Sequence, residues 1–173
     1  MVPAYARMMS AYNAWMNERI YTACADMSDG ERRRDRGAFF GSIHRTLDHI
    51  IYADSAFLAR FKGEPPPYTR PDVEIHAEFA AMRATRTALD RTIDEWAAGL
   101  DAGWLAAPFT YRSFVDGKQR TLPAWVLVTH LFNHQTHHRG QVTTLLKQAG
   151  VDPGVTDLPW LPGLDGIVAA PRT

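Results

Sequence analysis

The chain has 173 residues and a mass of 19.4 kDa, enough to bury a full hydrophobic core without disulfide or metal staples. Hydrophobic residues make up 46% of the sequence and charged residues 22%, as in packed globular proteins. Lys and Arg total 19 and Asp and Glu total 19, and this balance argues against a protein that binds nucleic acid. The single cysteine, Cys24, excludes an intrachain disulfide and a multi-cysteine zinc site, and is typical of a reducing compartment.

The sequence indicates a cytoplasmic protein with no membrane partner. The first residues show no basic flank followed by an apolar signal core. No segment approaches the roughly 18 uninterrupted apolar residues that a membrane span requires. We find no internal repeat, and we expect a single domain over residues 1–173.

Apolar residues recur at helical spacing in four long segments separated by clusters of Pro, Gly and Asp. These predicted helices run from about Ala4 to Met27, Gly37 to Lys62, Asp72 to Gly99, and Pro123 to Gly150. For the last of them, Thr121 is a candidate cap and Pro123 suits the first turn.

Between the third and fourth helices, Phe109–Val115 and Lys118–Thr121 flank the dipeptide Asp116-Gly117, a pattern that predicts a β-hairpin. After Gly150 the chain is rich in Pro and Gly, and predicts a loop anchored by Trp160 or a fraying end. The fold class is therefore all-α, a four-helix bundle with a small hairpin before the last long helix.

Four of the seven histidines crowd into the fourth helix. At about 100° per residue, His134 and His138 fall inside its apolar stripe, His130 lies at the edge, and His137 lies further round. A single histidine on an apolar face is usually a core residue bonded to a carbonyl. Two rings in successive turns are harder to satisfy in that way, because each brings two nitrogens that need partners. Imidazoles four residues apart are close enough to share one ion, so a metal site is favoured.

Two known kinds of metal site are excluded. In zincin-type hydrolases a Glu follows the first His and acts as general base, whereas Gln135 holds that place here. A di-iron bundle requires Glu-x-x-His motifs on two helices, and the chain has none. A mononuclear, nitrogen-dominated site favours zinc, nickel or iron over magnesium or calcium.

A third ligand has to come from another helix. His44 and His49 lie off the apolar centre of the second helix on opposite sides, and the small residues near His49 favour it only slightly. His76 fits a solvated residue in the first turn of the third helix. Asp54 lies inside an apolar stripe, where it suits a fourth ligand, a partner of a ligand, or a structural ion pair.

The flanking residues of the fourth helix carry further expectations. His130, one turn before His134, can line the pocket and act as a catalytic proton donor, or take a half-buried structural role. His137 is expected to face another helix or solvent. Arg139 lies too far round for the metal and can join helices or a dimer interface. The amides of Asn133 and Gln141 can orient ligand rings or only bond locally.

Three stretches of the sequence resemble the DinB family, within the wider DinB/YfiT-like superfamily of metalloenzymes. They are residues 12–19 (YNAWMNER), 42–50 (SIHRTLDHI) and 133–141 (NHQTHHRGQ), the last being the most specific. The resemblance implies a bundle in up-down-down-up order and a divalent metal held by three histidines. Carried over residue by residue, these ligands are His49, His134 and His138.

The resemblance also implies a function. Relatives in the superfamily transfer a low-molecular-weight thiol to an electrophile and often pair as homodimers. Three neutral imidazoles leave a divalent ion its full charge and an open position, which turns a coordinated thiol into a thiolate nucleophile. We therefore predict a thiol transferase. The alternatives are a hydrolase that uses metal-bound hydroxide and a non-catalytic metal-binding or stress-response bundle.

Overall fold

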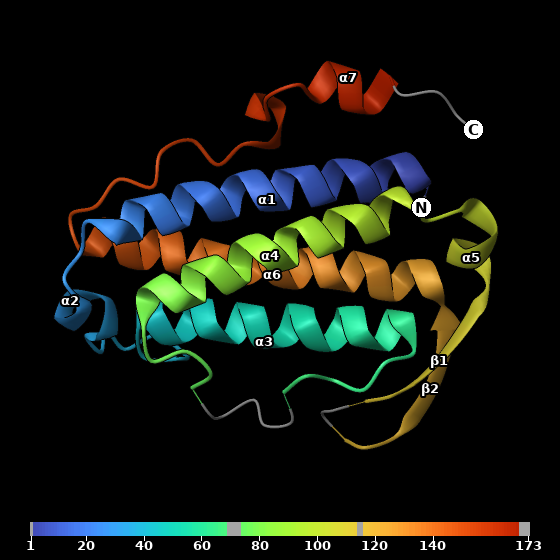
Figure 1. Cartoon of the computed structure of the whole chain (residues 1–173), viewed down its shortest axis with the longest axis horizontal. Helices are drawn as coiled ribbons and strands as arrows, with labels where there is room; N and C mark the ends of the chain where they lie inside the picture. Colours follow the sequence, from blue (N-terminus) through green and yellow to red (C-terminus); the bar gives the residue numbers. More distant parts are fainter. Residues whose placement is uncertain (1, 69–73, 114–115, 170–173) are drawn as a thin grey trace.

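The computed structural model describes residues 2–68, 74–113 and 116–169. Four long helices run through it: α1 (Pro3–Ala25), α3 (Ile43–Lys62), α4 (Phe79–Ala98) and α6 (Ala124–Gln148). Figure 1 shows that α3 and α4 run in the same direction, opposite to α1 and α6, which is the up-down-down-up order. The predicted fold class is confirmed.

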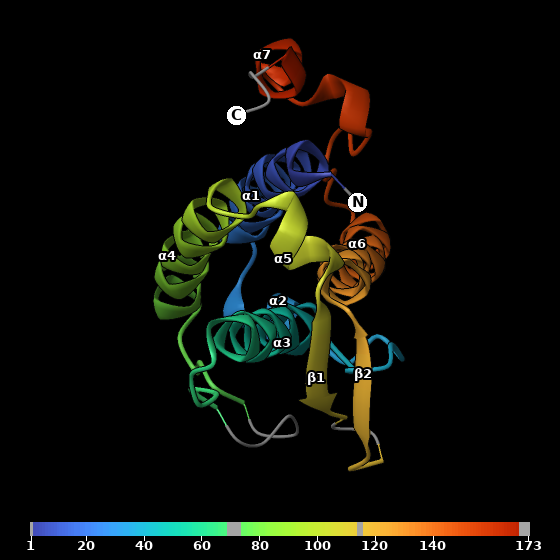
Figure 2. The same cartoon turned by 90° about the vertical axis from the view of Figure 1, so that its right-hand side faces the viewer.

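Shorter elements connect and extend the bundle. They are α2 (Asp29–Arg33), α5 (Ala102–Ala106), the 3₁₀ turn η1 (Leu158–Trp160) and α7 (Leu164–Ala169). Strands β1 (Pro108–Arg112) and β2 (Gln119–Pro123) pair antiparallel, with Pro108 opposite Pro123 and Arg112 opposite Gln119. The predicted hairpin is therefore present, although Val115 lies outside the described residues. Figure 2 shows it extending from the start of α6 alongside α3.

Two helices begin later than the periodicity predicts. Gly37 and Gly41 have positive φ angles (69° and 77°), so the predicted start at Gly37 is wrong and α3 begins after Ser42, whose hydroxyl accepts from the Arg45 amide. The predicted start at Asp72 lies outside the described residues. Residues 74–78 are not helical, and α4 begins only at Phe79.

Two smaller expectations are also wrong. Thr121 is not a helix cap, because it belongs to β2 and its hydroxyl bonds Thr110 across the hairpin at 2.8 Å. Trp160 is not an anchor, since it is 68% exposed. The C-terminal segment is instead held against α1 by buried Leu161 and by the Tyr12 hydroxyl, which donates to the Thr156 carbonyl at 2.6 Å.

A buried polar network joins all four long helices through the core. Arg86 of α4 pairs with Asp54 of α3 at 2.5 Å and with Asp90 one turn along at 2.7 Å. Asn13 of α1 donates to Asp90 at 2.9 Å and accepts from Arg139 of α6. All five side chains are buried, so Arg139 joins helices within the bundle, as one of its two predicted roles required. Removing one partner from such a network leaves a buried charge or polar group uncompensated, which strongly lowers the stability of the fold.

Candidate metal centre

Three histidines meet where α3 and α6 lie side by side. His49 extends from α3, and His134 and His138 extend from successive turns of α6. The Nε2 atom of His134 lies 3.3 Å from Nε2 of His49 and 3.1 Å from Nε2 of His138. One nitrogen from each ring falls within 4.8 Å of the others, so the group can hold a metal ion. The structure therefore brings together His49, His134 and His138, below called the triad, which is the set that the resemblance to the DinB family implied.

These rings are electrically neutral near pH 7. Burial, together with repulsion from His138 when that ring is protonated, lowers the pKa of His49 to about 4 and that of His134 to about 3. Burial also lowers the pKa of His138, although its hydrogen bond to Gln141 opposes that shift. Neutral imidazoles are the protonation state in which histidine binds metals.

Gln141 fixes the tautomer of one ring. Its Oε1 atom lies 2.7 Å from Nδ1 of His138, and its Nε2 atom lies 3.3 Å from Nε2 of exposed His137. Because a carboxamide oxygen only accepts, Nδ1 of His138 carries the proton and its Nε2 presents a lone pair to His134. Gln141 thus orients the ring of His138, a candidate ligand, which is one of its two predicted roles. His137 contacts Gln141 on the surface, away from the triad.

The donor set fits a single transition-metal ion. Two nitrogens bound at about 2.0–2.1 Å to a tetrahedral ion lie about 3.3 Å apart, which matches the His49–His134 separation. The three Nε2 atoms cannot satisfy one another by hydrogen bonds alone, because each neutral ring has only one N–H and that of His138 is used by Gln141. In the described part of the chain, no carboxylate or thiol joins the group. Three protein ligands leave a coordination position for another molecule.

Phe40, an aromatic residue that the sequence did not connect with the histidines, packs directly on the triad. Phe40, in the loop before α3, stacks on His49 with ring centroids 4.0 Å apart and an interplanar angle of 25°. Its centroid also lies 5.4 Å from that of His138. No spacing rule connects a loop aromatic with a histidine nine positions later, so only the fold reveals this contact. Phe40 shields one side of the triad from water.

The other side of the triad faces a mostly apolar cavity of about 730 Å³. Helices α3 and α6 form its walls and the β-hairpin closes one side, so His49 and His134 lie in its lining. His130 also lines the cavity, with its ring centroid 5.9 Å from that of His134. Burial and the charge of Arg60 lower the pKa of His130, so its ring is neutral at pH 7 and suits accepting a proton better than the predicted donation.

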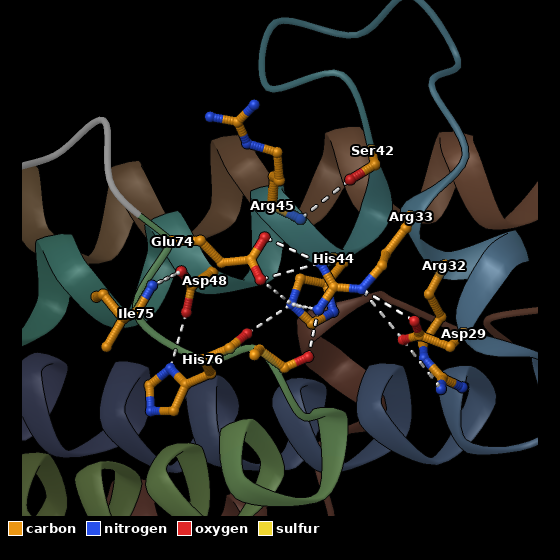
Figure 3. Close-up of polar contacts among 11 residues, drawn as sticks. Asp29, Arg32, Arg33, Ser42, His44, Arg45, Asp48, Glu74, Ile75 and His76 are labelled. Atoms are coloured by element: carbon orange, nitrogen blue, oxygen red, sulfur yellow. Dashed lines mark hydrogen bonds and ion pairs between the residues drawn. The ribbon is translucent and has the colours of Figure 1, made fainter.

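The other two candidate histidines belong to a separate polar cluster, shown in Figure 3. His44 is fully buried and its Nε2 lies 2.7 Å from the His76 carbonyl oxygen. The His76 ring lies between Asp48 (2.8 Å) and Thr85 (2.9 Å), so the expectation of a solvated first-turn residue is wrong. Asp48 also accepts from the Ile75 amide at 2.5 Å. These bonds hold residues 74–76 against α3, which is why α4 starts late.

The remaining candidates face the core. Asp54 pairs with Arg86, which identifies it as the structural ion pair among its three predicted roles. Gln135 is fully buried, and its amide lies close enough to Asp54 to influence the pKa of that carboxyl. Burial raises the pKa of Cys24 to about 12, so it is a core residue and not a nucleophile. No helix in the described part of the chain is long and apolar enough to cross a membrane.

Fold and site together define a helical bundle with a three-histidine centre that can bind a metal. The chain belongs to the DinB family, whose model matches residues 2–169. It is 24% identical over 161 residues to Protein DinB of Bacillus subtilis (strain 168), covering 88% of this chain and 91% of that protein. It also resembles the crystal structure of a DinB-like protein from Bacillus cereus ATCC 10987, with a TM-score of 0.63 and 21% identity over 82% of this chain and 91% of the other. That structural likeness supports the fold alone.

Proposed function

We propose that this protein is a metal-dependent transferase that joins a low-molecular-weight thiol to an electrophile, with His49, His134 and His138 as the metal ligands. The observation that carries the proposal is that the three-histidine group opens into a large apolar cavity and is not closed by a fourth protein ligand among the described residues. An open position beside a cavity is the mark of a catalytic site, whereas structural zinc sites are closed. Zinc or nickel is the expected ion, and iron is compatible with the same donors.

Residues of the chain supply the rest of the chemistry. A bound divalent ion supplies a Lewis acid that favours the thiolate over the thiol. Neutral His130 accepts the thiol proton, the sulfur forms a bond with the electrophilic carbon, and the leaving group departs with that proton. The apolar walls hold the electrophile and exclude water, which would otherwise compete as nucleophile. The thiol comes from solution because Cys24, the only cysteine, is buried and protonated.

The first experiment tests the metal ligands. We expect His138→Ala to lose bound zinc or nickel in elemental analysis of purified protein. His137→Ala is the matched control, because His137 is the adjacent residue, is exposed, and lies outside the triad. Retention of the metal by folded His138→Ala would show that the assignment is wrong.

A second experiment tests the reaction. Metal-loaded protein is offered a panel of electrophiles with and without glutathione or bacillithiol, and loss of free thiol is followed together with product mass. We expect His130→Gln to keep the metal and lose most of the transfer rate. Turnover of esters or amides that does not depend on thiol would support the hydrolase instead. Metal binding without any turnover would support a non-catalytic bundle. Sedimentation would test the homodimer that we also propose by resemblance to the superfamily.

A further inference from the structure

The three rings of the triad are held in place by different means. The Nδ1 atom of His138 lies 2.7 Å from Oε1 of Gln141, whereas the Nδ1 atoms of His49 and His134 are buried without a hydrogen-bond partner within the described ranges. A histidine that binds a metal is usually oriented by a hydrogen bond from its second ring nitrogen, because rotation of the ring about its last side-chain bond is otherwise weakly restricted. His49 is also the one member of the triad that extends from α3. Another contact therefore has to fix the orientation of the His49 ring.

The Phe40 ring makes that contact. It stacks on the face of the His49 ring, with centroids 4.0 Å apart and an interplanar angle of 25°. The same phenyl ring meets the His138 ring at an angle of 60°, with centroids 5.4 Å apart. Stacked and tilted arrangements are both favourable for aromatic pairs. Because a turn of the His49 ring out of this plane would break the stack, Phe40 restricts its rotation, and it contacts one member of the triad from each helix.

The loop that carries Phe40 is closed by main-chain hydrogen bonds. The Arg36 amide donates to the Gly41 carbonyl at 2.8 Å, and the Gly41 amide donates to the Ala38 carbonyl at 2.8 Å. Gly37 and Gly41 have φ angles of 69° and 77°, which residues with a side chain rarely adopt. The backbone of this tight loop therefore places Phe40 over His49.

Binding of a divalent ion would strengthen the stack. An imidazole that binds such an ion takes on part of its positive charge, and the face of a phenyl ring attracts positive charge. By linkage, a contact that is stronger in the metal-bound protein raises the affinity for the metal. The Phe40 ring is therefore expected to affect metal affinity, in addition to the shape of the metal-free site.

We propose that Phe40 is a positioning residue of the metal centre, whose stacked ring holds His49 in the orientation that binds the ion and takes the place of a hydrogen-bonded partner. The inference rests on the metal ligands of the proposed function and does not depend on the thiol transfer.

The first test measures zinc affinity by competition with a chromophoric chelator. Phe40→Leu keeps an apolar side chain but removes the ring, and Phe40→Tyr keeps the ring. Phe39→Leu is the matched control, because it removes a phenyl ring from the same loop at a position that is 85% exposed. We expect Phe40→Leu to weaken zinc binding about 2- to 12-fold, the equivalent of one aromatic pair, and the other two variants to match the wild type. Thermal melting of metal-free protein confirms folding, and Phe40→Met replaces Phe40→Leu if the latter does not fold.

The second test observes the stack directly by proton NMR of the metal-free protein. Protons above the face of an aromatic ring resonate upfield, so the carbon-bound ring protons of His49 should be shifted upfield in the wild type. They should move downfield in Phe40→Leu and stay in place in Phe39→Leu. This readout reports the position of the ring and does not follow from a general change in stability.

Four outcomes would overturn the inference. They are unchanged zinc affinity in folded Phe40→Leu, an equal loss in Phe40→Tyr, an equal loss in Phe39→Leu, and His49 signals that do not move in Phe40→Leu. Zinc that is lost from His138→Ala but retained at full affinity by Phe40→Leu would refute the role of Phe40 alone. A wild type that binds no zinc would refute the proposed ligands and this inference with them, whereas absence of thiol transfer would leave the role of Phe40 intact.

Discussion

The hydrogen bond between Gln141 and His138 offers a sharp test of the candidate metal centre. Gln141→Leu removes the oxygen that accepts from Nδ1 of His138 at 2.7 Å while keeping a side chain of similar size. His138 is only 7% exposed, so water is a poor substitute for the lost acceptor. The Nδ1 atoms of His49 and His134 have no hydrogen-bond partner within the described ranges, so among the three candidate ligands only the His138 ring has such support there.

Loss of a partner that orients a ligand typically weakens metal binding about 10- to 100-fold, or about 1.4–2.7 kcal/mol. Because His138 is buried, we expect Gln141→Leu to weaken zinc binding by a factor in the upper half of that range. Gln141→Glu should bind at least as tightly as the wild type, since a carboxylate is a stronger acceptor at the same position. Competition for zinc with a chromophoric chelator measures both affinities.

The control for this experiment is His137→Ala, which removes the other contact of the Gln141 amide but leaves its oxygen on His138. Its zinc affinity should match the wild type. If folded Gln141→Leu also bound zinc as tightly as the wild type, the Nδ1–H tautomer of His138 and its role as a ligand would both be refuted.

Three further predictions follow from the same structure. Zinc at 100 times its dissociation constant should stabilise the protein by about 2.7 kcal/mol and raise its melting temperature by about 5–11 °C, and His138→Ala should abolish the shift. Metal-free protein should lose about 3 kcal/mol of its free energy of unfolding in urea for each of His49 and His134, about 5–6 kcal/mol together, between about pH 6.5 and pH 4. The reason is that His49 and His134 have folded pKa values of about 4 and 3, below their unfolded value, and so take up protons mainly on unfolding; a curve unchanged by His49→Gln would contradict this. Asp54→Asn should lower stability by about 3 kcal/mol yet leave the metal content unchanged, because Asp54 pairs with Arg86; loss of metal from a folded variant would contradict this role.

Much of the architecture could be predicted from local patterns. Helical periodicity marked the four long helices, and two strand-like runs around Asp116-Gly117 marked the hairpin. The four-residue spacing of His134 and His138 placed their rings on one face without any tertiary information, since helix geometry alone determines it. The errors at helix starts also have local causes. Gly37 and Gly41 interrupt a pattern that is apolar enough for a helix, and residues 74–76 bond α3 instead of continuing into α4.

Helical periodicity could not decide which histidine of α3 completes the group; the resemblance to the DinB family pointed to His49, and the tertiary structure shows why it is that one. His44 and His49 lie on opposite sides of that helix, and periodicity gives angles within one helix but neither the rotation nor the register between two. The packing of α3 on α6 turns His49 toward His134, and it leaves His44 buried against the segment that precedes α4. The same packing places Phe40 on the His49 ring and Arg60 in the lining of the cavity. Residues far apart in the sequence form one site because side chains pack between helices. That packing depends on the whole sequence, so no local pattern reports it.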